Sequence, residues 1–548
     1  MYMANRKILI TCAFPYANGP IHIGHMLEHI QADIWARYHR MRGREVWFIS
    51  ADDAHGTAIM LQSEKLEISP EQLIGDVIKE HKLDFLNFNI SHDNYYSTHS
   101  TENFYFLKKI FLKLQKKGLI QEKIISQFYD NIKNIFLPDR FIKGTCPNCK
   151  SKNQYGDNCE VCSATYEPVD LIDPISVISG QHPILKKTKH LYFDLPFFSS
   201  ILKNWIHSGV LHNTVINKTE EWFKIGLKQW GISRDAPYFG FKIPNYLNKY
   251  FYVWLDAPIG YISAFKNLCS FNKKLHFKDL WCTDSEYELY HFIGKDIIYF
   301  HTLFWPAILE AANLRKPNSI FVHGYLTMNG LKLSKSRGVL LTAKDWIKYF
   351  DSDSLRYYFA SKLSNNINDI EINLKDFVHK INSDIVNKLV NLAARNASFI
   401  NIYFDNFLSR TLNDIKLYQY FIDSSKDIEI FLENRDFSSV IRKSMMLLDM
   451  ANHYINEKKP WLIAKQDPKN SELQIISTLG INLFRIIMIF LKPILPDLAK
   501  KTELFLIDEL RWNNINKPLL SHKIKKFIPL YKRININIVD HLTANFKE

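Results

Sequence analysis

The chain has 548 residues, enough for three or four domains at about 150 residues each. Hydrophobic residues make up 47% of it and charged residues 23%, a balance typical of a folded globular protein, which excludes extensive disorder. Lys and Arg number 70 against 56 acidic residues, and the net charge of +14 favours a polyanionic partner without identifying it. Seven cysteines are too few for a disulfide scaffold.

No apolar run reaches the roughly 20 residues that span a bilayer. The best candidate, 486–491, is short and closed by a basic residue at each end, so we interpret it as a buried helix face. The basic and apolar start of the chain, 6–13, is too short for a secretory signal and has no cleavage site after it. We therefore expect a cytoplasmic protein.

The first fifty residues have the pattern of a strand, a helix and a strand. Residues 8–14 are a continuous apolar run, typical of a strand buried on both faces. The turn-forming segment 15–20 follows, then apolar residues recur at helical spacing, and 46–51 is a second strand-like run. Such a crossover is right-handed and binds ligands at the carboxyl ends of its strands, which places 14–25 and 52–56 beside one crevice.

Strand-like runs return at 250–255, 291–294 and 320–323, and helical periodicity dominates from about residue 383 onward. The segment from about 118 to 235 differs in character and holds four of the seven cysteines. The pattern predicts an α/β fold, in which a doubly wound, Rossmann-like parallel sheet is interrupted by an inserted module and followed by an α-helical region.

His22-Ile23-Gly24-His25 stands at the start of the first predicted helix, directly after the turn. The two imidazoles share a helix face, and a helix amino terminus attracts negative charge, so this segment suits phosphate oxygens. Gly24 lets a flat ligand approach the backbone. Two surface histidines at a helix start are the alternative, but the position after a buried strand favours a functional role.

A second basic motif, Lys332-Leu333-Ser334-Lys335-Ser336, precedes Arg337 and Gly338. Lysines three residues apart, interleaved with hydroxyls, suit a pyrophosphate whose charge grows as it leaves. An exposed basic turn is the alternative for this segment in isolation.

Cys146-x-x-Cys149 and Cys159-x-x-Cys162 are separated by nine residues. Four thiolates in two paired turns suit tetrahedral zinc with no open position, so we predict one structural zinc knuckle held by these four cysteines. Four free thiols are disfavoured by this spacing in a reducing compartment. A redox pair is disfavoured because neither pair opens a helix after a strand.

The two basic motifs together resemble the His-Ile-Gly-His and Lys-Met-Ser-Lys-Ser motifs of class I aminoacyl-tRNA synthetases. Stretches 12–25, 51–57, 252–261 and 291–301 are similar to bacterial methionyl-tRNA synthetases, and the resemblance covers essentially the whole chain. Leu333 replaces the usual Met of the second motif, and Phe14 stands where the family has Leu.

The resemblance implies a catalytic domain at 1–117 and 236–324, a connective insert with the zinc knuckle at 118–235, a stem-contact region at 325–387 and an α-helical anticodon-binding domain at 388–548. It implies that methionine and ATP with Mg²⁺ form methionyl-adenylate and pyrophosphate, and that the methionyl group then passes to tRNA with release of AMP. The catalytic residues it implies are His22, His25, Lys332 and Lys335. The implied ATP-binding residues are His22, Gly24, His25, Gly294, Asp296, His323 and Lys335.

The methionine pocket implied by the resemblance pairs Asp53 with the substrate ammonium and surrounds the thioether with aromatic walls. Its residues are Ala13, Tyr16, Asp53, Trp254, Ala257, Pro258, Tyr261, Ile297 and His301. Without the resemblance, Trp254 and Tyr261 would be interpreted as core residues, and His323 as a structural histidine. Arg234 is a further candidate contact to phosphate or substrate.

The resemblance also implies anticodon recognition by Asn391, Arg395 and Trp461, with Trp461 stacking on a base. From spacing alone, Trp461 would be a core residue, and Asn391 and Arg395 a solvated helix face. The implied partners are ATP, L-methionine and methionine tRNA, both initiator and elongator. We expect a monomer, because no space remains after the helical region for an appended dimerisation domain.

Three other hypotheses compete with a methionine-specific ligase. Leucine, isoleucine or valine enzymes carry a much larger editing insertion, and cysteine enzymes hold a metal in the amino-acid pocket. A small nucleotidyltransferase shares the first motif but is much shorter. A catalytically silent RNA-binding paralogue is disfavoured by the intact His22, His25 and Lys335.

Overall fold

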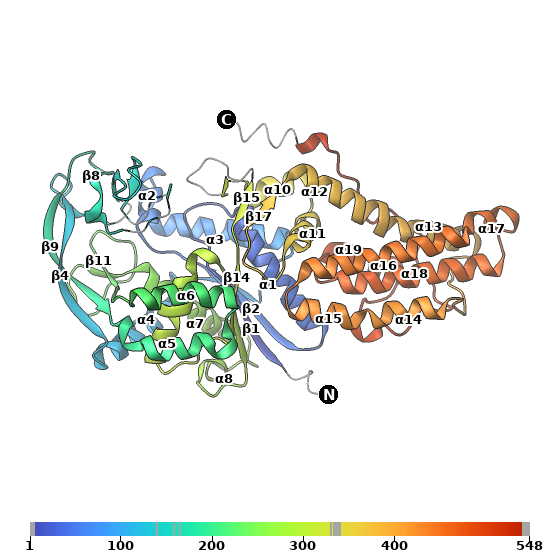
Figure 1. Ribbon diagram of the computed structural model, residues 1–548, viewed down its shortest axis with the longest axis horizontal. Helices are drawn as coiled ribbons and strands as arrows, with labels where there is room; N and C mark the ends of the chain where they lie inside the picture. Colours follow the sequence, from blue (N-terminus) through green and yellow to red (C-terminus); the bar gives the residue numbers. More distant parts are fainter. Residues whose placement is uncertain are drawn as a thin grey trace.

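The computed structural model describes residues 6–138, 141–156, 159, 161–162, 164, 166–328, 331–332 and 341–539, with backbone alone at 331–332. Figure 1 shows an elongated molecule, with an α/β body in its middle, a pair of long strands at one end and a helical bundle at the other.

The body is built on a five-stranded parallel sheet of order β14-β13-β1-β2-β3. Its strands are β1 (Lys7–Cys12), β2 (Glu45–Asp52), β3 (Asn94–Ser97), β13 (Glu288–Gly294) and β14 (Ser319–His323). From β1 the chain proceeds outward to β2 and β3, and it later returns to the other side of β1 through β13 and β14. The strand order therefore reverses at β1, and the crevice at its carboxyl end is the expected ligand site.

Both faces of the sheet are covered, which explains why consecutive residues of β1, Ile8, Leu9 and Ile10, are all apolar. Ile8 and Ile10 point into one core, together with helix α1 (Ile23–Met41), whereas Leu9 points into a second core with helix α7 (Val253–Phe271). The predicted doubly wound α/β fold is thus confirmed.

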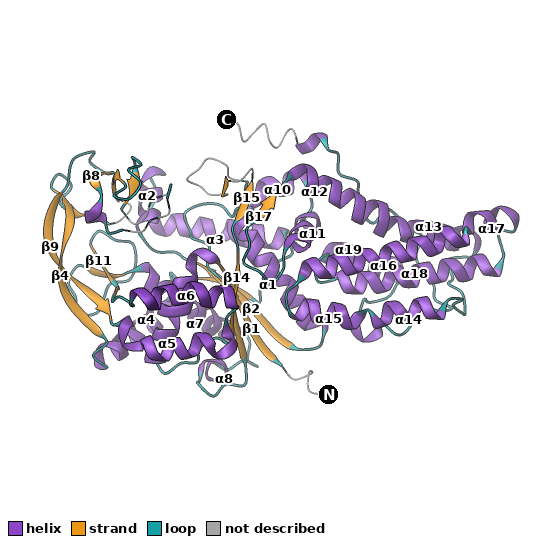
Figure 2. Ribbon diagram, viewed as in Figure 1, coloured by secondary structure: helices purple, strands orange, loops and turns teal. Residues whose placement is uncertain are grey.

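The remaining helices of the body lie around this sheet (Figure 2). They are α2 (Thr57–Lys65), α3 (Pro70–Asn87), α4 (Thr101–Lys116), α5 (Ser199–Trp205), α6 (Asn213–Ile225), α8 (Phe277–Trp281) and α9 (Trp305–Ala311).

Between β3 and β13 the chain forms a second structure away from the sheet. Strand β4 (Ile120–Asp130) runs antiparallel to β9 (Ile184–Phe193) over ten residue pairs, flanked by β5 (Ile135–Phe136) and β10 (Trp230–Gly231). A small sheet of order β7-β6-β8 lies near their tip and is formed by β7 (Gln154–Tyr155), β6 (Ile142–Thr145) and β8 (Ile172–Ser176). Two short strands, β11 (Ser233–Asp235) and β12 (Lys249–Phe251), lead back to the body.

After β14, a three-stranded sheet of β15 (Leu326–Met328), β16 (Leu331–Lys332) and β17 (Ile370–Ile372) joins the body to the bundle. The helices that follow β16 are α10 (Ala343–Tyr349), α11 (Ser352–Lys362), α12 (Leu374–Lys380), α13 (Asn391–Tyr403), α14 (Ile415–Asp423), α15 (Ser425–Glu433), α16 (Phe437–Lys458), α17 (Pro460–Gln466), α18 (Ser471–Leu491) and α19 (Pro496–Leu506).

Helix α18 corrects the expectation that no run is long enough for a bilayer. Its 21 residues are long and apolar enough to span a bilayer by length and composition, because the helix continues through Arg485. In the bundle Arg485 is 1% exposed and its Nε donates to Asp508 Oδ2 at 2.7 Å. Since 89% of its most apolar window is buried inside the protein, α18 is the central helix of the bundle core.

Candidate active site and metal centre

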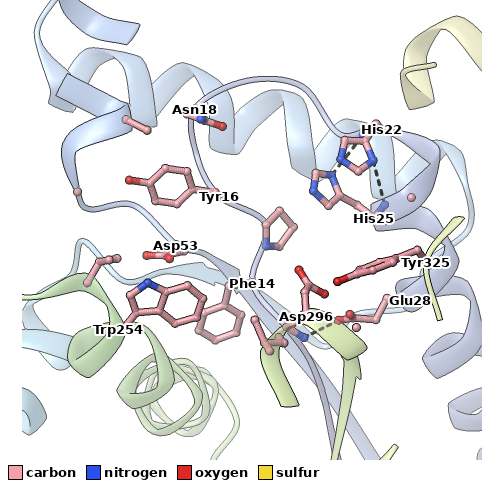
Figure 3. Close-up of a pocket in the computed structure, with 18 of the residues that line it drawn as sticks. Phe14, Tyr16, Asn18, His22, His25, Glu28, Asp53, Trp254, Asp296 and Tyr325 are labelled. Atoms are coloured by element: carbon pink, nitrogen blue, oxygen red, sulfur yellow. Dashed lines mark hydrogen bonds between the residues drawn. The ribbon is translucent and has the colours of Figure 1, made fainter. Parts of the chain in front are cut away.

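A cavity of about 540 Å³ opens at the carboxyl end of β1, where the strand order reverses. Figure 3 shows His22 and His25 on one side of it and Asp53 with Trp254 on the other. Segments that are up to about three hundred residues apart in sequence meet there. Of the residues implied by the family resemblance, those lining the cavity are Ala13, Tyr16, His22, Gly24, His25, Asp53, Trp254, Gly294, Asp296, Ile297 and His323.

His22 and His25 form the amino-terminal cap of α1. The His25 N–H donates to His22 Nδ1 and the His22 N–H donates to His25 Nδ1, both at 3.3 Å, in a reciprocal capping box. Their rings stack with centroids 3.6 Å apart. Because each Nδ1 accepts a backbone proton, each neutral ring carries its own proton on Nε2. The pair is therefore a double N–H donor at a helix amino terminus, which suits an anion.

Gly24 supports this cap by its lack of a side chain. A Cβ at this position would lie 2.9 Å from both Cε1 and Nδ1 of His22. The motif therefore requires glycine so that the His22 ring can fold back over the helix start. This is a second reason for glycine at this position, besides the expected close approach of a ligand to the backbone.

Glu28, one turn further along α1, joins three elements at the cavity floor. Its Oε1 accepts the Ala13 N–H at 2.6 Å, and its Oε2 lies 3.2 Å from His323 Nε2. Burial raises the pKa of Glu28, although His323 opposes this. Burial disfavours protonation of His323, but the hydrogen bond and charge of Glu28 raise its pKa overall.

Asp53 lies at the other end of the cavity, just beyond β2. Its Oδ1 is buried and has no hydrogen-bond partner in the described part of the chain. Burial raises the pKa of Asp53 well above its usual range, and the nearby carboxylates of Asp256 and Asp52 raise it further. An uncompensated carboxylate of this kind is suited to a cationic ligand group, whose charge would lower that pKa again.

Gly294 ends β13 and leads into the turn that carries Asp296. A Cβ on Gly294 would lie 2.6 Å from Asp296 Oδ1, so only glycine leaves this carboxylate in its place. Tyr325 and Lys295 lie beside it, and the Lys295 ammonium is 4.3 Å from the centre of the Tyr325 ring.

Four residues expected in the methionine pocket do not line the cavity: Ala257, Pro258, Tyr261 and His301. Phe14 does line it and packs against Tyr261 with ring centroids 4.6 Å apart, so Tyr261 lies behind Phe14. The Tyr261 hydroxyl is 2.9 Å from His301 Nε2 in a buried pair. The aromatic wall at this end is completed by Trp254, which stacks on Phe300 at 3.8 Å.

The second basic motif falls largely outside the described residues, because Lys335 lies in the segment 333–340. For Lys332 the backbone is described, and it pairs with Thr327 of β15. Both flanks of the segment adjoin the cavity: Leu326 lines it, and Thr342 forms an isolated bridge with His22.

The four predicted cysteine ligands are brought together, with all Sγ atoms within 4.8 Å of one another. The Sγ of Cys146 is 3.9 Å from that of Cys162, and Cys149 and Cys159 are 3.5 Å apart. Tetrahedral zinc with bonds of about 2.3 Å requires sulfurs about 3.8 Å apart, so the cluster fits a metal ion of this kind. Backbone N–H groups of Cys149 and Cys162 point at Sγ atoms at 3.4 Å, which favours thiolates.

At the far end of the bundle, Arg395 and Trp461 lie side by side, with the guanidinium 5.1 Å from the centre of the indole ring. Trp461 is 40% exposed, so it is not the core residue that spacing alone suggested. Asn391 is exposed one turn before Arg395 on α13, and so lies on the same helix face.

Sequence reasoning missed Glu28, Asn18 and Tyr325, which also line the cavity. Glu28 could have been found, because it follows His25 by three residues and so lies on the same helix face. Asn18 and Tyr325 carried no local signal. Arg234 also lines the cavity, with its guanidinium 3.5 Å from the centre of the Tyr252 ring.

Comparison with known proteins shows which family has this architecture. A family model described as tRNA synthetases class I (M) matches residues 8–397, and the anticodon binding domain of methionyl tRNA ligase matches 413–526. The crystal structure of Mycobacterium tuberculosis methionyl-tRNA synthetase in complex with methionyl-adenylate superposes with a TM-score of 0.79 over 96% of this chain and 100% of that one, at 20% identity. The fold is thus that of a class I tRNA synthetase.

Curated relatives define the family more narrowly. Methionine–tRNA ligase of Buchnera aphidicola subsp. Acyrthosiphon pisum (strain APS) is 74% identical over 531 residues, 97% of each chain. That of Buchnera aphidicola subsp. Schizaphis graminum is 71% identical over 530 residues, again 97% of each chain. The chain belongs to the methionine–tRNA ligase family.

Proposed function

We propose that this protein ligates L-methionine to its cognate tRNA at the expense of ATP, through a methionyl-adenylate that releases pyrophosphate and then AMP. The observation that carries this proposal is that one cavity holds the paired imidazole donors of His22 and His25 at one end and the uncompensated carboxylate of Asp53 at the other. A site with an anion-binding end and a cation-binding end suits a zwitterionic amino acid activated by a polyphosphate.

At the nucleotide end, the Nε2–H groups of His22 and His25 stabilise the charge that develops on the α-phosphate during in-line displacement. Asp296 accepts a ribose hydroxyl, beside Gly294 and His323. Lys332 and Lys335 hold the β- and γ-phosphates, with which Mg²⁺ enters as the ATP complex. This assignment is supported by the two flanks of the lysine segment, because Leu326 lines the cavity and Thr342 forms a bridge with His22.

At the amino-acid end, Asp53 pairs with the substrate ammonium, and Ala13, Tyr16, Trp254 and Ile297 surround the side chain. Ala257, Pro258, Tyr261 and His301 complete the methionine site, in which Tyr261 packs behind Phe14. The buried Tyr261–His301 hydrogen bond offers the one weakly polar contact that a thioether needs.

Cys146, Cys149, Cys159 and Cys162 hold one structural Zn²⁺, because four thiolates leave no position open for chemistry. The ion stabilises the tip of the long β4–β9 ribbon. We assign the catalytic domain to 1–117 and 236–324, the insert to 118–235, the stem-contact region to 325–387 and the anticodon-binding domain to 388–548.

For tRNA, Trp461 stacks on an anticodon base while Asn391 and Arg395 bind base edges. Recognition through the anticodon serves both the initiator and the elongator methionine tRNA. We further propose a monomer in the cytoplasm, which size-exclusion chromatography with light scattering and cell fractionation test.

Amino-acid-dependent ATP–pyrophosphate exchange tests the proposed activity. Exchange should occur with methionine and fail with leucine, isoleucine, valine and cysteine. Lys335→Ala should slow exchange at least a hundredfold while the thermal midpoint stays unchanged, with exposed Lys79→Ala as the matched control. Exchange that depends on leucine and not on methionine would refute the assignment. The absence of exchange with every amino acid would refute it as well.

A further inference from the structure

A second cavity, of about 200 Å³, lies between the body and the bundle, outside the catalytic cavity. It is bounded by the edge strand β14, helix α1 and the loop between α15 and α16, which meet in the middle of the molecule (Figure 1). Its described lining contains no acidic residue: Gln31, Gly209, Leu211, His212, Ser319, Ile320, Phe321, Val322, Ser364, Asn365 and Arg435.

Arg435 is the cation of this cavity. Its guanidinium lies 3.2 Å from the centre of the Phe321 ring, and no described residue accepts a hydrogen bond from its side chain. Burial lowers the pKa of Arg435 to about 10, although Tyr290 and Glu433 oppose this. Glu433 does not neutralise it, because that carboxylate already binds Arg6 and Arg44.

The backbone at Arg435 is also unusual, because its φ of 59° is left-handed. It follows Asn434, the C-cap residue of α15, at a position where glycine or asparagine is the ordinary residue. An arginine there costs about 1 kcal/mol relative to glycine, so the guanidinium is placed in the cavity against the local backbone preference.

Gln31 is the second unusual residue. It is 4% exposed, its Oε1 is buried without a hydrogen-bond partner, and no described residue bonds its Nε2. A buried amide without partners is costly, and toward an oxyanion it donates through its Nε2 alone, because its Oε1 is itself an acceptor. Ser364 adds a donor, because its hydroxyl oxygen accepts the Asn366 N–H and its own proton remains for a ligand.

We propose that this cavity binds a phosphate oxyanion, held by the Arg435 guanidinium, the Gln31 amide and the Ser364 hydroxyl. Donors that converge from three elements suit a tetrahedral oxyanion better than a planar carboxylate. The site shares two elements with the catalytic cavity: Gln31 follows Glu28 by one turn of α1, and Phe321 precedes His323 by two residues on β14.

The oxyanion has two sources. One is free phosphate or pyrophosphate, and the other is a backbone phosphodiester of bound tRNA, which rests on the proposed function. Arg435→Asn separates this site from the catalytic one, because asparagine tolerates the left-handed backbone and the residue lies outside the catalytic cavity. Methionine-dependent exchange should therefore be unchanged in this variant, so failure of this proposal and failure of the proposed function are distinguishable.

The first arm titrates inorganic phosphate by calorimetry at constant ionic strength, with a non-hydrolysable methionyl-adenylate analogue filling the catalytic cavity. The wild type should bind one phosphate, and Arg435→Asn should bind it at least tenfold more weakly, since a charge-assisted contact is lost. Arg435→Lys should lie between them. The exposed Arg410→Asn, which carries the same charge change in the bundle, should match the wild type.

Gln31→Leu tests the site without touching the charge. Because a leucine removes an unsatisfied buried amide, the thermal midpoint without phosphate should stay equal or rise, while phosphate binding weakens about fivefold or more. A structural role for Gln31 would instead lower the midpoint and leave phosphate binding intact, and that result would overturn the assignment of this residue. The same variant keeps the proposal testable where Arg435→Asn fails to fold.

The second arm measures tRNA affinity over a range of salt concentrations. If a phosphodiester occupies the site, Arg435→Asn should reduce the slope of log K against log salt by about 0.9, and free phosphate should compete with tRNA. An effect on phosphate alone assigns the site to the free anion, and an effect on the tRNA slope assigns it to the nucleic acid. Identical phosphate binding and identical salt slopes in wild type and Arg435→Asn would overturn the proposal.

Discussion

Gly24→Ala separates the stability of α1 from the chemistry at its amino terminus. The new Cβ would lie 2.9 Å from Cε1 and Nδ1 of His22, whereas ordinary contacts begin at 3.4 Å, so the ring must move by about 0.5 Å or more. That movement breaks the 3.3 Å hydrogen bond from the His25 N–H, and the stacked His25 ring loses its support.

The two effects on stability oppose each other. Losing a helix cap costs about 1 kcal/mol, and replacing glycine by alanine within a helix gains about 0.5–1 kcal/mol. The free energy of unfolding should therefore change by less than about 1 kcal/mol. Catalysis has no such compensation: since a donor misplaced by about 1 Å costs on the order of a hundredfold in rate, a shift of about 0.5 Å should cost about tenfold. Methionine-dependent exchange should fall by that factor.

Gly75→Ala is the matched control, because Gly75 also lies inside a helix, α3, and a Cβ there would meet nothing within 4 Å. It should raise the free energy of unfolding by up to about 1 kcal/mol and leave exchange unchanged. Both quantities come from urea denaturation and exchange rates measured on the same preparations. A Gly24→Ala protein with at least half of the wild-type exchange rate would refute the argument that this glycine positions His22.

Three further perturbations address other parts of the chain. Burial disfavours protonation of His81, but its 2.6 Å bond to Asp52 raises the pKa overall, so the pair contributes stability below about pH 6.5 that is lost as the pH rises through the raised value. His81→Gln should therefore cost more free energy of unfolding at pH 6 than at pH 9. Cys149→Ser should abolish zinc retention, measured by atomic absorption, whereas Cys269→Ser outside the cluster should not. Trp461→Ala should reduce tRNA charging about tenfold or more while exchange stays normal.

Each of these has a contrary outcome. An equal stability loss of His81→Gln at both pH values would show that the histidine is not charged in the folded protein. Full zinc content in Cys149→Ser would place the metal elsewhere. Normal charging by Trp461→Ala would remove the indole from anticodon recognition.

The sequence by itself determined the strand–turn–helix–strand start, the two basic motifs and the cysteine spacing, because these depend on residues close together in the chain. Apolar runs buried on both faces identified the parallel sheet, and the reciprocal cap at His22 and His25 is encoded within four residues. The class of protein could be predicted from these local patterns alone.

Only the tertiary structure decided which distant side chains meet. Glu28 and His323 are 295 positions apart, Phe14 covers Tyr261, and Arg485 is buried within α18 through its bond to Asp508. Gln31 and Arg435 likewise share one cavity although they lie on α1 and on the loop before α16. Periodicity reports which face of an element is buried, but a hydrogen bond or an ion pair depends on the partner that packing brings to that face, and that partner is set by the fold as a whole.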